Sequence, residues 1–102
     1  MSSDLVHTTA QYIVTAFDIG DELVVPESIT LEEIRKGLVE RIIHLLNVNP
    51  EKLMSILYRI DVSETRVNEI FAHAMPPDIP EQLADLIIER QLQKARTRRQ
   101  GS

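Results

Sequence analysis

The stretch NPEKLMSILYRIDVSETRVNEIF (residues 49–71) combines two helix starts with a short turn between them. Asn49 can cap a helix whose first position is Pro50, where the missing amide hydrogen does no harm. The turn follows as DVS, and its Ser63 can cap the next helix. We therefore predict two helices joined by a very short corner, over residues 50–60 and 64–74.

A third helix start lies upstream of this stretch. Thr30 can cap the first free amides, and Glu33 can reach back to the threonine amide, which is the pattern of a capping box. Apolar residues then recur at helical spacing as far as Leu46, as in a helix with one buried stripe. Gly37 inside this helix costs up to about 1 kcal/mol relative to alanine. Either nothing compensates this cost, or the glycine allows another helix to approach closely. We favour the close approach.

Prolines delimit the last helix. Pro76 and Pro77 push the residues before them out of helical geometry, and an apolar stripe begins after Pro80. That stripe fades after Leu92, so we expect the final turns to be exposed and frayed. The sequence thus predicts an all-α fold, a compact bundle of about four helices over residues 31–47, 50–60, 64–74 and 80–98.

Residues 1–29 carry two conflicting signals. Leu5, Ile13 and Phe17 lie on one helical stripe, whereas the runs YIVT and LVV favour strands. Periodicity favours a helix over residues 4–17 that is followed by a linker. We predict two units, an N-terminal extension over residues 1–29 and a helical bundle domain over residues 30–99.

The composition is that of a soluble globular protein, with 102 residues of which 43% are hydrophobic and 26% charged. Because the chain has no cysteine, it has no disulfide, thiolate nucleophile or cysteine-bound metal. The first residues lack the basic start and apolar core of a secretion signal, and no apolar run approaches the roughly 20 residues of a membrane span. We therefore expect one cytoplasmic protein with no membrane partner.

The net charge of −5 is unevenly distributed. The segment 90–99 has five basic and no acidic residues, which leaves residues 1–89 with 16 acidic and six basic residues, a net −10. Such a tail balances the acidic body, solvates a helix end, or contacts an anionic partner. The residues available for anion or partner contact are Arg90, Lys94, Arg96, Arg98 and Arg99.

The corner has a possible DNA-binding interpretation. The run IDVS at residues 60–63 looks like the turn common in helix-turn-helix proteins, and aspartate tolerates the left-handed conformation that such a turn needs. The helix that follows would present Arg66 and Asn68 to a base edge. Glu64 and Glu69 stand beside them, and carboxylates oppose the phosphate contacts that supply much of the affinity.

We favour a structural joint over DNA binding at this corner. In that interpretation Tyr58 is a core ring with its hydroxyl at the surface, and Ser63 is a cap. Arg59 then clamps the corner by pairing with a nearby carboxylate. The candidate partners of Arg59 are Asp61 of the corner and Asp85 and Glu89 of the last helix.

Catalytic and metal-binding patterns are weak. The histidines stand alone, without a partner at metal-ligand spacing: His7, His44 and His73. The chain has no phosphate-binding glycine loop and no nucleophile elbow. We expect no enzyme activity, no cofactor and no metal. A carboxylate-dependent enzyme would need another acid to converge with Glu32, Glu33 or Glu40.

The stretches SILYRIDVSE (55–64) and LADLIIERQLQKARTR (83–98) resemble those of a group of short, uncharacterised bacterial all-helical proteins. That group shares a tyrosine-arginine-isoleucine-aspartate turn and a C-terminal helix that ends in basic residues. The likeness spans about residues 31–98. It implies a common fold, and it brings no activity, cofactor or catalytic residue.

The helices have wide apolar faces. Several apolar residues lie outside the narrowest buried stripes: Ile43, Leu46, Met54, Ile88 and Leu92. Such faces can expose enough apolar surface to require a partner, and two-fold dimers are the commonest solution. We therefore expect a small, non-catalytic interaction or regulatory module that self-associates or binds another protein. The alternative is a helix-turn-helix-like nucleic-acid-binding protein that uses the 50–74 corner and the basic tail.

Overall fold

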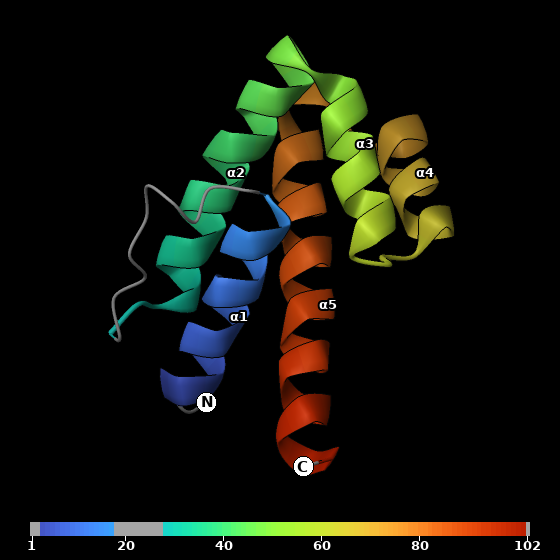
Figure 1. Ribbon diagram of the computed structural model, residues 1–102. Coiled ribbons are helices and arrows are strands. Elements are labelled where there is room, and N and C mark those ends of the chain that lie inside the picture. The colour runs from blue at the N-terminus through green and yellow to red at the C-terminus, as the bar shows by residue number, and fades with distance from the viewer. Residues whose placement is uncertain (1–2, 18–27, 102) are drawn as a thin grey trace.

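The computed structural model describes residues 3–17 and 28–101, and side chains within 4–17 and 28–97. The described residues form no strand, which confirms the all-α prediction. The described residues form five α-helices and one short 3-10 helix in place of the predicted bundle of about four, and the additional α-helix lies in the N-terminal segment (Figure 1). These are α1 (Ser3–Ala16), α2 (Leu31–Val48), α3 (Pro50–Arg59), α4 (Glu64–His73), η1 (Pro76–Asp78) and α5 (Ile79–Gly101).

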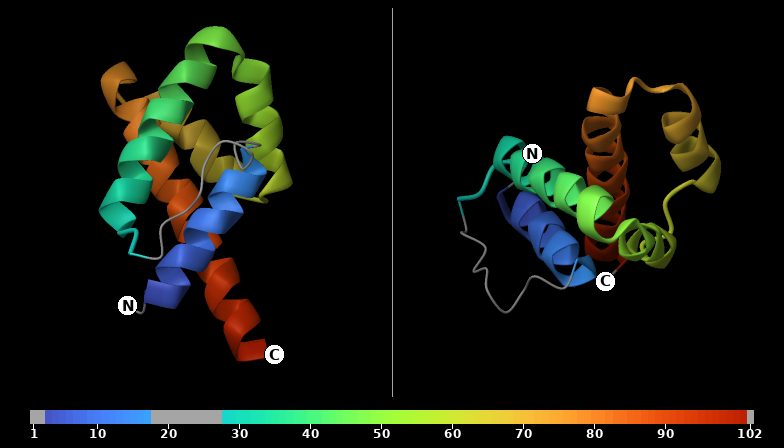
Figure 2. Two further views of the ribbon diagram at one scale, coloured as in Figure 1. Left: turned by 60° about the vertical axis from the view of Figure 1, so that its left-hand side comes forward. Right: turned by 90° about the horizontal axis from the view of Figure 1, so that it is seen from above.

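Helix α5 is the centre of the fold. It contacts α1, α2, η1 and α4, whereas α3 packs on α2. Helices α1 and α2 lie on one side of α5, and α3 and α4 lie on the other (Figures 1 and 2). The last turns of α5 project beyond the other helices. No helix in the described part of the chain is long and apolar enough to cross a membrane.

Helix α1 belongs to the core, and its presence confirms the helix predicted over residues 4–17. Its buried side chains recur at helical spacing and join the same apolar cluster as residues of α2, α3 and α5. They are Val6, Ala10, Ile13 and Ala16, with Phe17 just beyond the helix. The predicted boundary at residue 29 therefore does not divide the protein into two separately packed units. Most of the predicted linker lies outside the described residues.

Side-chain caps set the ends of α2 and α3 as predicted. Thr30 accepts from the Glu33 amide at 3.1 Å, and Glu33 accepts from the Thr30 amide at 3.3 Å, which completes a capping box. Asn49 ends α2 by donating its own amide to the Leu45 carbonyl at 2.8 Å. It also begins α3, because its side chain accepts from the Lys52 amide at 3.2 Å.

The expectation of a close approach at Gly37 is wrong. This residue is exposed, and a Cβ added to it would meet no atom of the described residues within 4 Å. The conformational cost of a glycine in the interior of α2 therefore goes uncompensated.

The expectation that the turns of α5 after Leu92 are all exposed is also wrong. Ala95 is fully buried, and it continues a line through Ala84, Ile88 and Gln91 that lies beside the stripe of Leu83 and Ile87. Two adjacent buried stripes are what a helix needs when α1 and α2 both pack against it. Because Gln91 is polar, the second buried stripe cannot be recognised from a pattern of apolar residues in the sequence.

Candidate functional site

The corner between α3 and α4 is a Schellman motif followed by a serine cap. Asp61 has φ 60 and its amide donates to the Tyr58 carbonyl at 3.2 Å. The Val62 amide donates to the Leu57 carbonyl at 3.5 Å, so the last carbonyls of α3 are satisfied. Ser63 then accepts from the Arg66 amide at 3.3 Å. Aspartate stands at the position that glycine usually takes, and the left-handed conformation predicted for it is confirmed.

Three basic side chains link the corner and helix α4 to helix α5. The Arg90 guanidinium of α5 pairs with the Asp61 carboxylate at 3.5 Å. Lys94 donates to the Ile60 carbonyl at 2.9 Å, where the negative end of the α3 dipole favours a cation. Arg66 of α4 pairs with Glu89 of α5 at 3.3 Å. The two ion pairs are mostly exposed, so they orient the corner more than they stabilise it.

The pairing predicted for Arg59 with a nearby carboxylate stays a prediction. Each of the three candidate carboxylates is bound by another arginine: Asp61 by Arg90, Glu89 by Arg66, and Asp85 by Arg35. The pair between Arg35 and Asp85 has an N–O distance of 2.7 Å and links α2 to α5. The hydrogen bond to Asp85 and the negative charge of Asp85 raise the pKa of Arg35, and the charge of Glu81 makes a smaller contribution.

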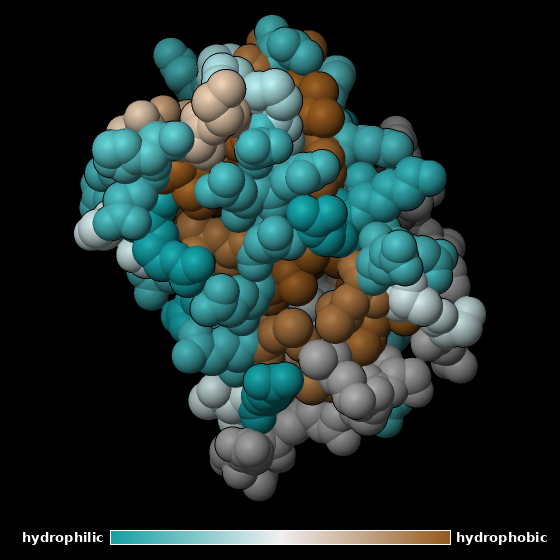
Figure 3. Space-filling view, turned by 180° about the vertical axis from the view of Figure 1, so that it is seen from behind, coloured by the Kyte–Doolittle hydropathy of each residue, from teal (hydrophilic) through white to brown (hydrophobic). Residues whose placement is uncertain are grey.

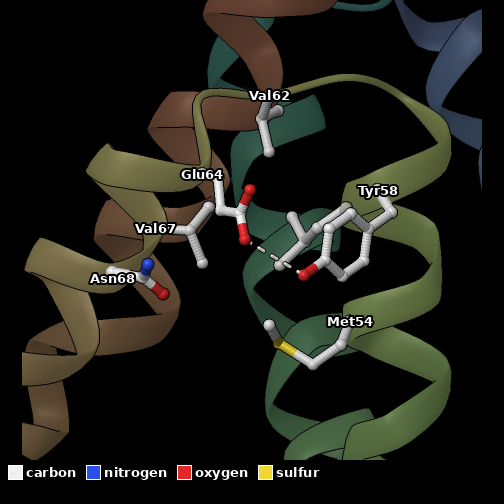
Figure 4. A pocket seen from close by; sticks show the side chains of 7 residues that line it. Met54, Tyr58, Val62, Glu64, Val67 and Asn68 are labelled. Carbon is white, nitrogen blue, oxygen red and sulfur yellow. Dashed lines mark hydrogen bonds between the residues drawn. The ribbon is translucent and has the colours of Figure 1, made fainter.

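The ring of Tyr58 is not in the core, which corrects the prediction made for it. It is 66% exposed, and its hydroxyl donates to the Glu64 carboxylate at 3.2 Å (Figure 4). The ring stands at a small hollow of about 30 Å³ between α3 and α4. The hollow is lined by Met54, Leu57, Tyr58, Val62, Glu64, Val67 and Asn68.

Helix α4 is weakly held to the rest of the protein. Val67 is its sole buried residue, although all ten residues of this helix are described. Phe71, one turn further along α4, is 39% exposed. On the side that faces α5, polar hollows of about 490 and 350 Å³ flank the pair of Arg66 and Glu89. Hollows therefore lie on two sides of helix α4, one toward α3 and the others toward α5.

The apolar side of helices α3 and α4 and their corner is named the α3–α4 face below. Met54 and Tyr58 are one turn apart on α3, as are Val67 and Phe71 on α4. Asn68 precedes Phe71 by three residues, so it lies on the same side of α4. The face consists of Met54, Tyr58, Val62, Glu64, Val67, Asn68 and Phe71. Only Glu64 among them is charged, and Tyr58 donates to it.

The basic residues of the predicted tail do not act as one group. Arg90 and Lys94 are bound to the corner, and Arg96 is exposed. The side chains of Arg98 and Arg99 lie outside the described ones.

Carboxylates and histidines do not converge. Glu33 is part of the α2 cap, and Glu32 and Glu40 are exposed. In the part of the chain that the structure describes, no three His, Asp or Glu residues could hold a metal ion. Of the residues assigned to a recognition helix, Arg66 is paired with Glu89, and Asn68 lines the hollow.

Comparison with known proteins finds no matching protein family, no similar curated protein and no similar solved structure. The resemblance seen in the corner and the last helix therefore stays a prediction.

Proposed function

We propose that the protein is a non-catalytic interaction module that self-associates, and that the α3–α4 face is its contact surface. The observation that carries this proposal is the composition of that face, which exposes the rings of Tyr58 and Phe71, includes an apolar hollow beside Tyr58 and has one carboxylate. Interface cores are depleted in charge and enriched in Tyr, Phe and Met. Charged residues make up 26% of the whole chain, whereas this face of seven residues has one.

Apolar side chains also reach the surface in the view from behind Figure 1, as a band between polar ones (Figure 3). The α3–α4 face is preferred because it combines exposed rings with a hollow.

Sedimentation velocity over a range of concentrations tests self-association. We expect a reversible dimer whose population grows with concentration. A single monomeric species at high micromolar concentration would refute the proposal.

The alternative function is helix-turn-helix-like nucleic-acid binding through residues 50–74. The short corner with a left-handed Asp61 favours it. The pair of Arg66 with Glu89 opposes it, because a phosphate would have to displace a carboxylate. Retention on random-sequence DNA that weakens with salt would support this alternative, and no retention at low salt would exclude it.

A further inference from the structure

The α3–α4 face combines features that fit one particular occupant. We infer that a second copy of this chain docks on it, in a two-fold symmetric contact that places the Asn68 side chains of both copies next to each other. This inference rests on the proposed function and adds the surface, the symmetry and the residue at the axis.

The first argument is shape. In a two-fold contact the same patch meets itself, so it has to carry both the projecting groups and the recesses that receive them. The α3–α4 face does so, because Tyr58 is a mostly exposed ring beside the hollow that Met54 and Val67 line (Figure 4). Phe71 is a partly exposed ring one turn beyond Val67 on α4. A ring of one copy can therefore cover the hollow of the other.

The second argument is charge. Each copy has a net charge of −5, so two copies repel each other over most of their surface. On the α3–α4 face the single carboxylate, Glu64, accepts a hydrogen bond from Tyr58 at 3.2 Å. This face is therefore one where a second copy can approach without opposing rows of like charges.

The third argument is hydrogen bonding. Asn68 is exposed and lines the hollow, one turn from both Glu64 and Phe71 along α4. An asparagine side chain has a donor and an acceptor, so it can pair with its own copy across a two-fold axis. A carboxylate or an ammonium group cannot pair in this way, which makes Asn68 suited to the axis.

The test compares Asn68→Asp with Asn47→Asp, which makes the same change at an exposed position of α2. Sedimentation equilibrium of the full chain gives the dimer dissociation constant, and circular dichroism shows that each variant is folded. Two carboxylates at the axis should raise the dissociation constant at neutral pH by about 100-fold or more. The control should change it by about twofold at most. Tyr58→Lys, at a mostly exposed position, provides a second variant with the same expected direction.

The outcomes separate this inference from the proposed function. A wild-type dimer that Asn68→Asp and Tyr58→Lys weaken, and Asn47→Asp does not, supports both. A wild-type dimer that none of these changes weakens leaves self-association in place and overturns the assignment of this face. A wild-type monomer at high micromolar concentration overturns both.

Discussion

Replacing Gly37 with alanine should stabilise the protein. The residue lies inside α2, is exposed, and has no atom of the described residues within 4 Å of the place that a Cβ would take. An added methyl group therefore meets no steric opposition, and the full difference in helix propensity, about 0.8–1.0 kcal/mol, should appear in the free energy of unfolding. For a chain of this size that gain corresponds to a rise of about 4–8 °C in the melting temperature.

Thermal and urea unfolding, followed by circular dichroism, measure this gain. The matched control is Lys36→Gly, at the neighbouring exposed position of α2, which should lose about 0.7 kcal/mol or more. If Gly37→Ala lowers the stability instead, another segment or a second copy approaches this side of α2, and the packing around α2 described above is incorrect.

Three further changes test the fold. Ile13→Ala should cost about 2–5 kcal/mol in urea unfolding, because this α1 side chain is buried in the common core, and a cost below about 1 kcal/mol would mean that α1 is an appendage. Asp61→Ala should lower the free energy of unfolding by about 1–2 kcal/mol, because Asp61 has a positive φ of 60 that alanine disfavours. Asp61→Gly should stay within about 1 kcal/mol of the wild type, because glycine adopts this conformation freely. Equal losses of stability in the two variants would argue against the left-handed corner. Lys94→Met should lower the free energy of unfolding by about 1–3 kcal/mol, because it removes the donor to the Ile60 carbonyl. An unchanged melting temperature would show that water replaces the lysine as the donor.

Local chemistry explains why most helix boundaries could be predicted. The capping box at Thr30, the double role of Asn49 and the serine cap of α4 depend on residues within four positions of one another. The left-handed Asp61 belongs to the same class, because its conformation follows from where α3 ends. Such signals require no knowledge of the tertiary packing.

The incorrect predictions concern contacts between distant segments. Gly37 faces open space, and nothing near it in sequence could show this. The hollow beside Tyr58 is lined by residues of α3, of the corner and of α4, and a pattern of apolar residues does not encode such an arrangement.

Cysteine cross-linking at position 68 tests the two-fold contact most directly. The chain has no cysteine, so Asn68→Cys introduces a single thiol, and Asn47→Cys is its control on α2. A disulfide forms only when the two Cα atoms come within about 7 Å, so it reports the axis itself. We predict that mild oxidation converts Asn68→Cys into a linked dimer with the wild-type fold and leaves Asn47→Cys mostly monomeric. Equal cross-linking of the two variants, or none at position 68 in a protein that sediments as a dimer, would contradict the proposed contact.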